Sequence, residues 1–100
     1  MLGLEQAMVQ VIENRADIDG RVLAVKLDDA RPNHRLVTIE VGAAAPVEGY
    51  PNLFASAPGK QLHVVMPTEI ANALQIGTAV RCRIRRAGPT TIFGERCAPR

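Results

Sequence analysis

The side chains best suited to chemistry gather near the C-terminus of the 100-residue chain, in the segment VRCRIRRAGPTTIFGERC at residues 80–97. This segment holds both cysteines, whereas His34 and His63 lie elsewhere, at spacings that match no common zinc-binding pattern. The chain also lacks a nucleophile elbow, a phosphate-binding glycine loop and a metal-binding helix motif. We therefore expect a protein that is not an enzyme and that uses no metal and no cofactor.

The two cysteines have different expected roles. Cys82 alternates with Val80 and Ile84, so we expect it to face the core as a small apolar residue, whereas Cys97 is expected to be a free thiol. The first residues resemble no secretory signal, and no apolar run approaches the ~20 residues that cross a bilayer. We expect a cytoplasmic protein with reduced thiols and no membrane partner.

Arginine dominates the charge of the C-terminal fifth of the chain. Six arginines and a single acidic residue, Glu95, lie from Arg81 onward, although the net charge of the whole chain is only +2. Arg81, Arg83 and Arg85 alternate with apolar residues, so they are expected to share one face of a strand at intervals of ~7 Å. Such a row could follow successive phosphates of a nucleic acid. Alternatively, it only keeps the strand soluble and discourages edge pairing.

The first half of the chain supplies a helix and two strands. Residues 3–14 carry apolar side chains at helical spacing, which predicts an N-terminal helix. RVLAVKL and RLVTIEV then alternate with period two, and the DDARPNH between them is rich in turn residues. This pattern is typical of an antiparallel hairpin with a long loop. Its expected core-facing residues are Leu23, Val25 and Leu27 on the first strand and Val37, Ile39 and Val41 on the second.

The second half adds a long connection, a strand, a helix and two more strands. Residues 42–60 are rich in proline and glycine, so we do not expect a continuous strand there, and Tyr50 and Phe54 make this segment a candidate binding loop. Alternatively, the two rings pack over one end of the core. QLHVVM predicts a third strand, TEIANAL a short helix that ends before Gly77, and TAVRCRIRR and TTIFGER the last two strands.

Five strands with a short helix between the third and fourth form the order of an OB-fold, a Greek-key barrel. We expect one such mostly β domain over residues 1–100, with the barrel at 15–97. RADIDGRV also resembles the opening R-N-x-L-x-G-x-V of the TOBE domain, the OB-like ligand-binding module of molybdate-binding proteins and some transporter ATPases. VVMPTEIANALQIGTAVRCRIRR resembles that family's strand, short helix, L-x-x-G and strand. The residues that match are Arg15, Ile18, Gly20 and Val22, then Leu74, Gly77 and Val80.

The TOBE resemblance implies binding of an oxyanion and association in pairs. This chain departs from the family at the positions that help to supply donors to the anion, which are occupied by Ala16, Val65 and Thr68, so only one hydroxyl is kept. TOBE-like binding of a small ligand through Thr68 is one alternative function. A protein-interaction or homodimerisation module that uses the loop with Tyr50 and Phe54 is another.

The OB-like order points first to single-stranded DNA or RNA, because OB-folds bind oligonucleotides over strands two and three and the loops between strands one and two and strands four and five. Only three residues of the chain are aromatic and none is tryptophan, so few rings are available for base stacking. We expect a non-catalytic binding module. Its predicted nucleic-acid-binding residues are Arg31, His34, Arg35, Arg81, Arg83, Arg85 and Arg86.

Overall fold

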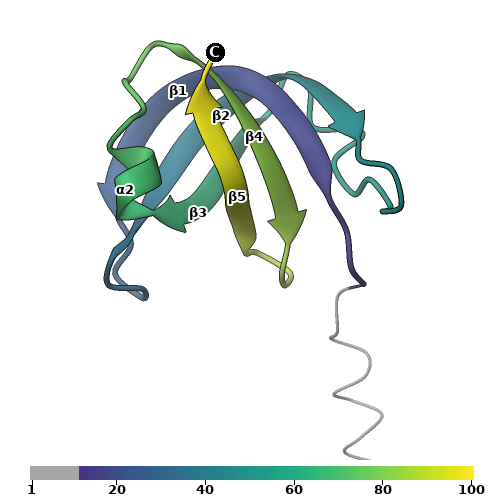
Figure 1. Ribbon diagram of the computed structural model, residues 1–100, viewed down its shortest axis with the longest axis horizontal. Coiled ribbons are helices and arrows are strands. Elements are labelled where there is room, and N and C mark those ends of the chain that lie inside the picture. Colours follow the sequence, from purple (N-terminus) through teal and green to yellow (C-terminus); the bar gives the residue numbers. More distant parts are fainter. Residues whose placement is uncertain (1–11) are drawn as a thin grey trace, which may run out of the picture.

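The chain folds into a closed five-stranded β-barrel, seen in a computed structural model that describes residues 12–100 (Figure 1). The strands follow the order β1-β2-β3-β5-β4 around the barrel, and β4 pairs with β1 to close it. All neighbours are antiparallel except β3 and β5. The elements are β1 (Ala16–Leu27), β2 (His34–Pro46), β3 (Gln61–Pro67), α2 (Thr68–Ala71), β4 (Ala79–Arg86) and β5 (Ile92–Pro99).

This architecture confirms a mostly β chain with five strands and one short helix between the third and fourth, and it is consistent with an OB-like barrel. The helix is shorter than the predicted TEIANAL. After Ala71 the α-helix gives way to tighter turns of the 3-10 type, because Ala73 and Leu74 donate their backbone N–H groups to carbonyls three residues earlier. Most of the predicted N-terminal helix lies outside the described residues, and residues 12–15 form no regular element.

The core fills the barrel with aliphatic side chains from all five strands. Val37, Ile39 and Val41 are buried as predicted, and so is Cys82 between Val80 and Ile84. The face predicted for the first strand is partly wrong, because Leu27 is 70% exposed whereas Val22 is fully buried. Register shifts between Asp19 and Gly20 and between Val22 and Ala24 change which residues face inward along β1.

The second strand is longer than its sequence suggests. Residues 42–46, which we expected in a loop, continue β2, and residues 43–46 pair with Ala16–Asp19 of β1, so the loop begins only at Val47. Gly20 allows the close approach of the two strands, because a Cβ there would collide with the backbone oxygen of Glu40. The requirement for glycine at this crossing gives a physical reason for its place in the matched RADIDGRV pattern.

The loop at residues 47–60 covers part of the barrel on the side away from α2 (Figure 1). Phe54 is buried in the core, and the chain returns to the sheet through a bond from Gly59 N to Val41 O at 2.8 Å. The packing interpretation is therefore confirmed for Phe54, whereas Tyr50 is 40% exposed. No helix within residues 12–100 is both long enough and apolar enough to cross a membrane.

Candidate nucleic-acid interface

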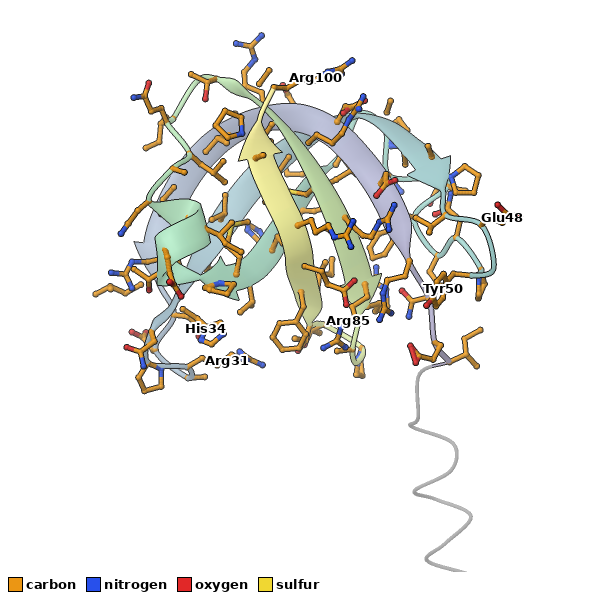
Figure 2. All side chains as sticks on the ribbon, viewed as in Figure 1. Arg31, His34, Glu48, Tyr50, Arg85 and Arg100 are labelled. Carbon is orange, nitrogen blue, oxygen red and sulfur yellow. The ribbon has the colours of Figure 1, made fainter. Side chains whose placement is uncertain are left out.

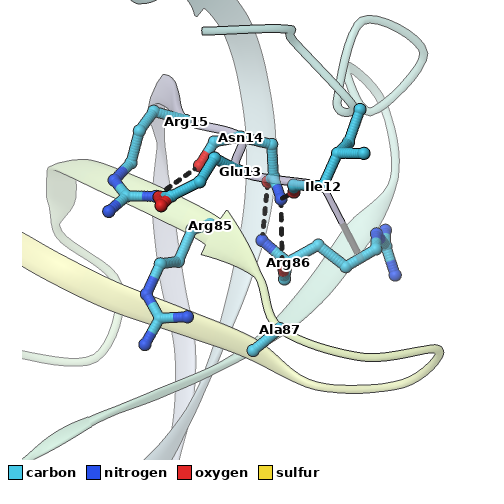
Figure 3. A pocket seen from close by; sticks show the side chains of 7 residues that line it. All are labelled: Ile12, Glu13, Asn14, Arg15, Arg85, Arg86 and Ala87. Atoms are coloured by element: carbon cyan, nitrogen blue, oxygen red, sulfur yellow. Dashed lines mark hydrogen bonds and ion pairs between the residues drawn. The ribbon is translucent and has the colours of Figure 1, made fainter. Parts of the chain in front are cut away.

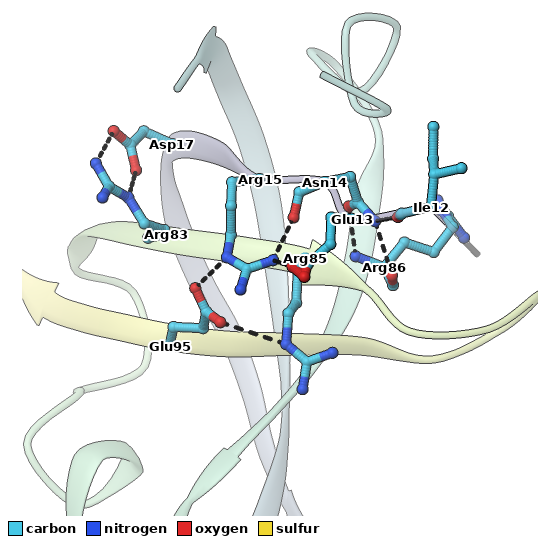
Figure 4. A network of polar contacts seen from close by, with 9 residues as sticks. All are labelled: Ile12, Glu13, Asn14, Arg15, Asp17, Arg83, Arg85, Arg86 and Glu95. Carbon is cyan, nitrogen blue, oxygen red and sulfur yellow. Dashed lines mark hydrogen bonds and ion pairs between the residues drawn. The ribbon is translucent and has the colours of Figure 1, made fainter. Parts of the chain in front are cut away.

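The arginines of β4 face outward as predicted, but two of them are held by carboxylates of β1. Arg83 donates from Nε and Nη2 to the two oxygens of Asp17 at 2.9 and 3.1 Å (Figure 4). Arg81 contacts Asp19 in the same two-pronged way, at 2.7 and 3.3 Å. The register explains both pairs, because Asp17 lies opposite Arg83 and Asp19 opposite Arg81 in the β1–β4 ladder.

These pairs reduce the positive potential that β4 presents to a polyanion. The hydrogen bond from Arg83 lowers the pKa of Asp17, and the hydrogen bond from Arg81 lowers that of Asp19, so both carboxylates stay charged. Asp19 also binds Arg100 at 3.0 Å. A phosphate that approached Arg81 or Arg83 would have to compete with a carboxylate already in place. The row of arginines is therefore present, but its first two members are largely neutralised.

Glu95 joins β5 to the end of β4. It sits at the irregularity in the β4–β5 register and forms ion pairs with Arg15, whose Nε lies 2.7 Å from Oε1, and with Arg85, whose Nε lies 3.3 Å from Oε2 (Figure 4). Arg15 has further partners, since its Nη1 donates to Asn14 O at 2.7 Å. Two guanidinium groups thus share the Glu95 carboxylate, and Arg15 also pairs with Glu13 Oε1 at 3.4 Å, so two cations and two carboxylates balance in this cluster.

Phe93 is the residue of this surface that sequence reasoning missed. It lies opposite Arg85 in the β4–β5 ladder and on the outer face, where it is only partly buried. The Arg85 guanidinium carbon lies 4.8 Å from the centroid of the Phe93 ring, and that of Arg31 lies 5.2 Å from it. The sequence signal was available, because Phe93 alternates with the inward Ile92 and Gly94.

The β1–β2 loop brings the second cation to this ring. Arg31 donates to Asp28 Oδ2 at 3.2 Å, and Asp28 also accepts the Ala30 backbone N–H at 3.0 Å. Figure 2 shows Arg31, His34 and Arg85 at the same end of the barrel. The predicted convergence of the two loop regions therefore occurs for Arg31 and Arg85, with Phe93 between their elements.

Arg35 and His34 stand beside this region but make local contacts. Arg35 Nη1 donates to Thr68 Oγ1 at 3.0 Å and to His34 O at 3.1 Å, which ties β2 to the start of α2. His34 Nδ1 lies 3.2 Å from Pro32 O, which requires a proton on that nitrogen. Among residues 12–100, Arg35 has no carboxylate partner, so its charge is uncompensated.

Arg86 turns away from the other predicted residues. Its guanidinium carbon lies 5.1 Å from the Phe54 ring centroid, and Figure 4 shows its side chain and that of Arg85 pointing apart. The backbone of Arg86 is held by Asn14, which is 1% exposed: Asn14 Nδ2 donates to Arg86 O at 2.9 Å and its Oδ1 accepts from Arg86 N at 2.8 Å. Both residues line a cleft of about 210 Å³ (Figure 3).

The structure thus divides the seven predicted nucleic-acid-binding residues. Arg31 and Arg85 meet across Phe93 with His34 and Arg35 nearby, Arg81 and Arg83 bind aspartates farther along β4, and Arg86 packs on Phe54. Within the part of the chain that the structure describes, no three His, Cys, Asp or Glu side chains are grouped as metal ligands would be. No protein-family model matches the chain, and no curated protein is similar enough to it to count as a relative.

Proposed function

We propose that this protein is a non-catalytic module that binds single-stranded DNA or RNA around Phe93, on an OB-like Greek-key barrel. The observation that carries the proposal is the partly exposed Phe93 ring with two guanidinium groups within about 5 Å of its centroid. A base can stack on such a ring when a guanidinium moves off its face to contact a flanking phosphate. Single-strand binding proteins combine these two interactions, stacking on aromatic rings and contacts between cations and the backbone.

The fold supports this location. The strand order supports the proposed Greek key, because β4 returns to the side of β1 and the strands lie in the order β4-β1-β2-β3. OB-folds bind oligonucleotides beside the loops that join strands one and two and strands four and five. In this chain the first of these loops supplies Arg31, while Arg85 and Phe93 are the paired residues next to the second.

Arg31 and Arg85 can turn toward phosphate without leaving their carboxylates unpaired. If Arg85 moves, Glu95 keeps its ion pair with Arg15, which is the shorter of its two. If Arg31 moves, Asp28 keeps the hydrogen bond from the Ala30 backbone N–H. Asp17 is different, because within residues 12–100 its side chain is bonded only to Arg83. Exchange of partners is therefore easier at Phe93 than at Arg83, since an abandoned carboxylate loses much of its stabilisation.

The test is a titration of labelled single-stranded DNA and RNA against the full chain at several salt concentrations, followed by fluorescence anisotropy. Loss of two phosphate contacts in R31A/R85A should flatten the slope of log K against log salt by about 1.4, at about 0.7 per contact. The matched control is R21A/K60A, which removes the same charge; Arg21 pairs with Ala79 at the far end of β4 from Arg85. No salt-dependent binding, or equal losses in both variants, would contradict the proposal.

A small oxyanion is a second candidate ligand, favoured by the contact between Arg35 and Thr68. Thr68 carries the one hydroxyl kept from the TOBE-like pattern. Arg35, whose charge is uncompensated, donates from Nη1 to this hydroxyl at 3.0 Å. Thermal-shift measurements with molybdate, tungstate and sulfate test this function. Stabilisation by millimolar anion that disappears in R35A would support it, and an unchanged melting temperature with all three anions would exclude it.

A further inference from the structure

The two cysteines of the chain face each other across β4 and β5. Cys82 and Cys97 are direct partners in the β4–β5 ladder, and both contact the hydrophobic core. Neither is in a disulfide. Since the chain has only these two cysteines, any disulfide within one molecule must join them.

The type of ladder position brings the two side chains close. Arg100 N donates to Ala79 O at 3.0 Å, which makes residues 79 and 100 a hydrogen-bonded pair. Hydrogen-bonded and non-hydrogen-bonded pairs alternate along an antiparallel ladder, so 80/99 is non-hydrogen-bonded, 81/98 hydrogen-bonded and 82/97 non-hydrogen-bonded. Pro99, which has no N–H, agrees with this assignment. Cα atoms of non-hydrogen-bonded pairs are about 4.5 Å apart, which lies within the range of about 4.4–6.8 Å that disulfides span.

The surroundings leave room for the sulfur atoms on the inner face. Gly94 lies beside Cys97 on the bulged strand, and a Cβ at Gly94 would lie 2.7 Å from Cys97 Sγ. Because Gly94 has no side chain, the Cys97 sulfur can occupy the space beside it. The contact with the Cys97 thiol, together with burial, raises the pKa of Cys82, so Cys82 is held as a thiol beside its partner.

Only one of the two thiols can be reached from solvent. Cys82 is fully buried, whereas Cys97 is partly exposed and lines a surface cavity of about 560 Å³ with Arg96, Pro99 and neighbouring residues. A small oxidant that enters this cavity meets Cys97 first. Cys82 lies directly opposite Cys97 in the β4–β5 ladder, which is the arrangement of an attacking thiol and a resolving thiol.

We propose that Cys82 and Cys97 form a reversible cross-strand disulfide when the protein meets hydrogen peroxide. The Cys97 thiol gives up its proton and the thiolate attacks one peroxide oxygen. The O–O bond breaks and the departing hydroxide takes up that proton, so the products are a sulfenic acid on Cys97 and one water molecule. The Cys82 sulfur then attacks the Cys97 sulfur, the S–O bond breaks, and a second water leaves with the Cys82 proton. The two thiols are oxidised by two electrons and the peroxide is reduced. A dithiol such as dithiothreitol reverses the step by exchange. Transient redox disulfides of this kind are the ones found in reducing compartments.

The experiment uses the purified full chain, exposed to hydrogen peroxide, quenched with N-ethylmaleimide under denaturing conditions and weighed intact by mass spectrometry. The expected product is a monomer lighter by two hydrogen atoms that takes up no maleimide, and dithiothreitol should restore two maleimide-reactive thiols. In C97S, peroxide should leave Cys82 reduced and fully reactive after denaturation. In C82A, the Cys97 sulfenic acid should persist long enough to react with dimedone.

Two results would overturn the proposal. One is wild-type protein in which Cys97 is overoxidised to a sulfinic acid while Cys82 still reacts with maleimide. The other is a product in which Cys97 joins two molecules and no intramolecular disulfide is found. The wild-type measurement decides the question even if either variant folds poorly. It is also independent of nucleic-acid binding, so the two proposals can fail separately.

Discussion

Replacement of Asn14 by alanine tests the contact that fixes the end of β4. The buried Asn14 side chain makes three hydrogen bonds, to Ile12 O at 2.8 Å, to Arg86 O at 2.9 Å and from Arg86 N at 2.8 Å. Each bond contributes about 1 kcal/mol, and an unsatisfied buried group costs about 1–3 kcal/mol. Water from the adjacent cleft can replace part of the loss. We therefore expect N14A to lower the free energy of unfolding by ~2–3 kcal/mol.

For a domain of this size, a loss of that amount lowers the melting temperature by ~8–24 °C. The assay is urea and thermal unfolding followed by circular dichroism. N72A is the matched control, because Asn72 follows α2, is exposed, and its side-chain amide makes no hydrogen bond to residues 12–100. A difference of less than about 0.5 kcal/mol between N14A and N72A, the usual scatter of surface substitutions, would refute the assigned role of Asn14.

Three further substitutions test the barrel itself. Because Arg83 lowers the pKa of Asp17, this pair stabilises the fold above the unfolded-state pKa of about 3.9 and ceases to do so as the pH falls through the lower folded value. Urea midpoints should therefore show D17N less stable than wild type at neutral pH, with the gap closing in strong acid. G94A should lose ~1–3 kcal/mol in the same assay, because its Cβ would press on Cys97 and Val64, whereas G88A has open space and should change little. F54A should lose ~3–5 kcal/mol by emptying a core position, and Y50A, whose ring is 40% exposed, should lose far less.

The alternation of apolar and polar residues was sufficient to predict most of the fold. It predicted five strands and the inward side of Cys82, because a period of two in a half-buried strand reports directly which face is covered. The helix between the third and fourth strands was predicted from TEIANAL and the Gly77 that follows it. The alternation did not predict the extension of β2 through Ala43, Ala44 and Ala45, which are weak strand formers. Their pairing with residues 17–19 of β1 is what makes them a strand.

The site was harder to predict because its partners come from distant parts of the chain. The spacing of Arg81 and Arg83 showed that both face outward, yet it could not show that Asp17 and Asp19 lie opposite them across the barrel closure. The contact between Arg31 and Phe93 likewise depends on how the β1–β2 loop folds over β5. Such contacts follow from strand register, and a register is set by the whole barrel.

The most direct test of the proposed function is the affinity of F93A for single-stranded DNA relative to wild type. Y50A is the matched control, since Tyr50 also carries a guanidinium, that of Arg15, at 5.0 Å from its ring. Loss of one stacked base, about 1–3 kcal/mol, should weaken binding by F93A about 5- to 150-fold while circular dichroism shows an intact fold. F93W should restore binding and Y50A should leave it unchanged. Wild-type affinity in F93A would contradict a base-stacking role for Phe93.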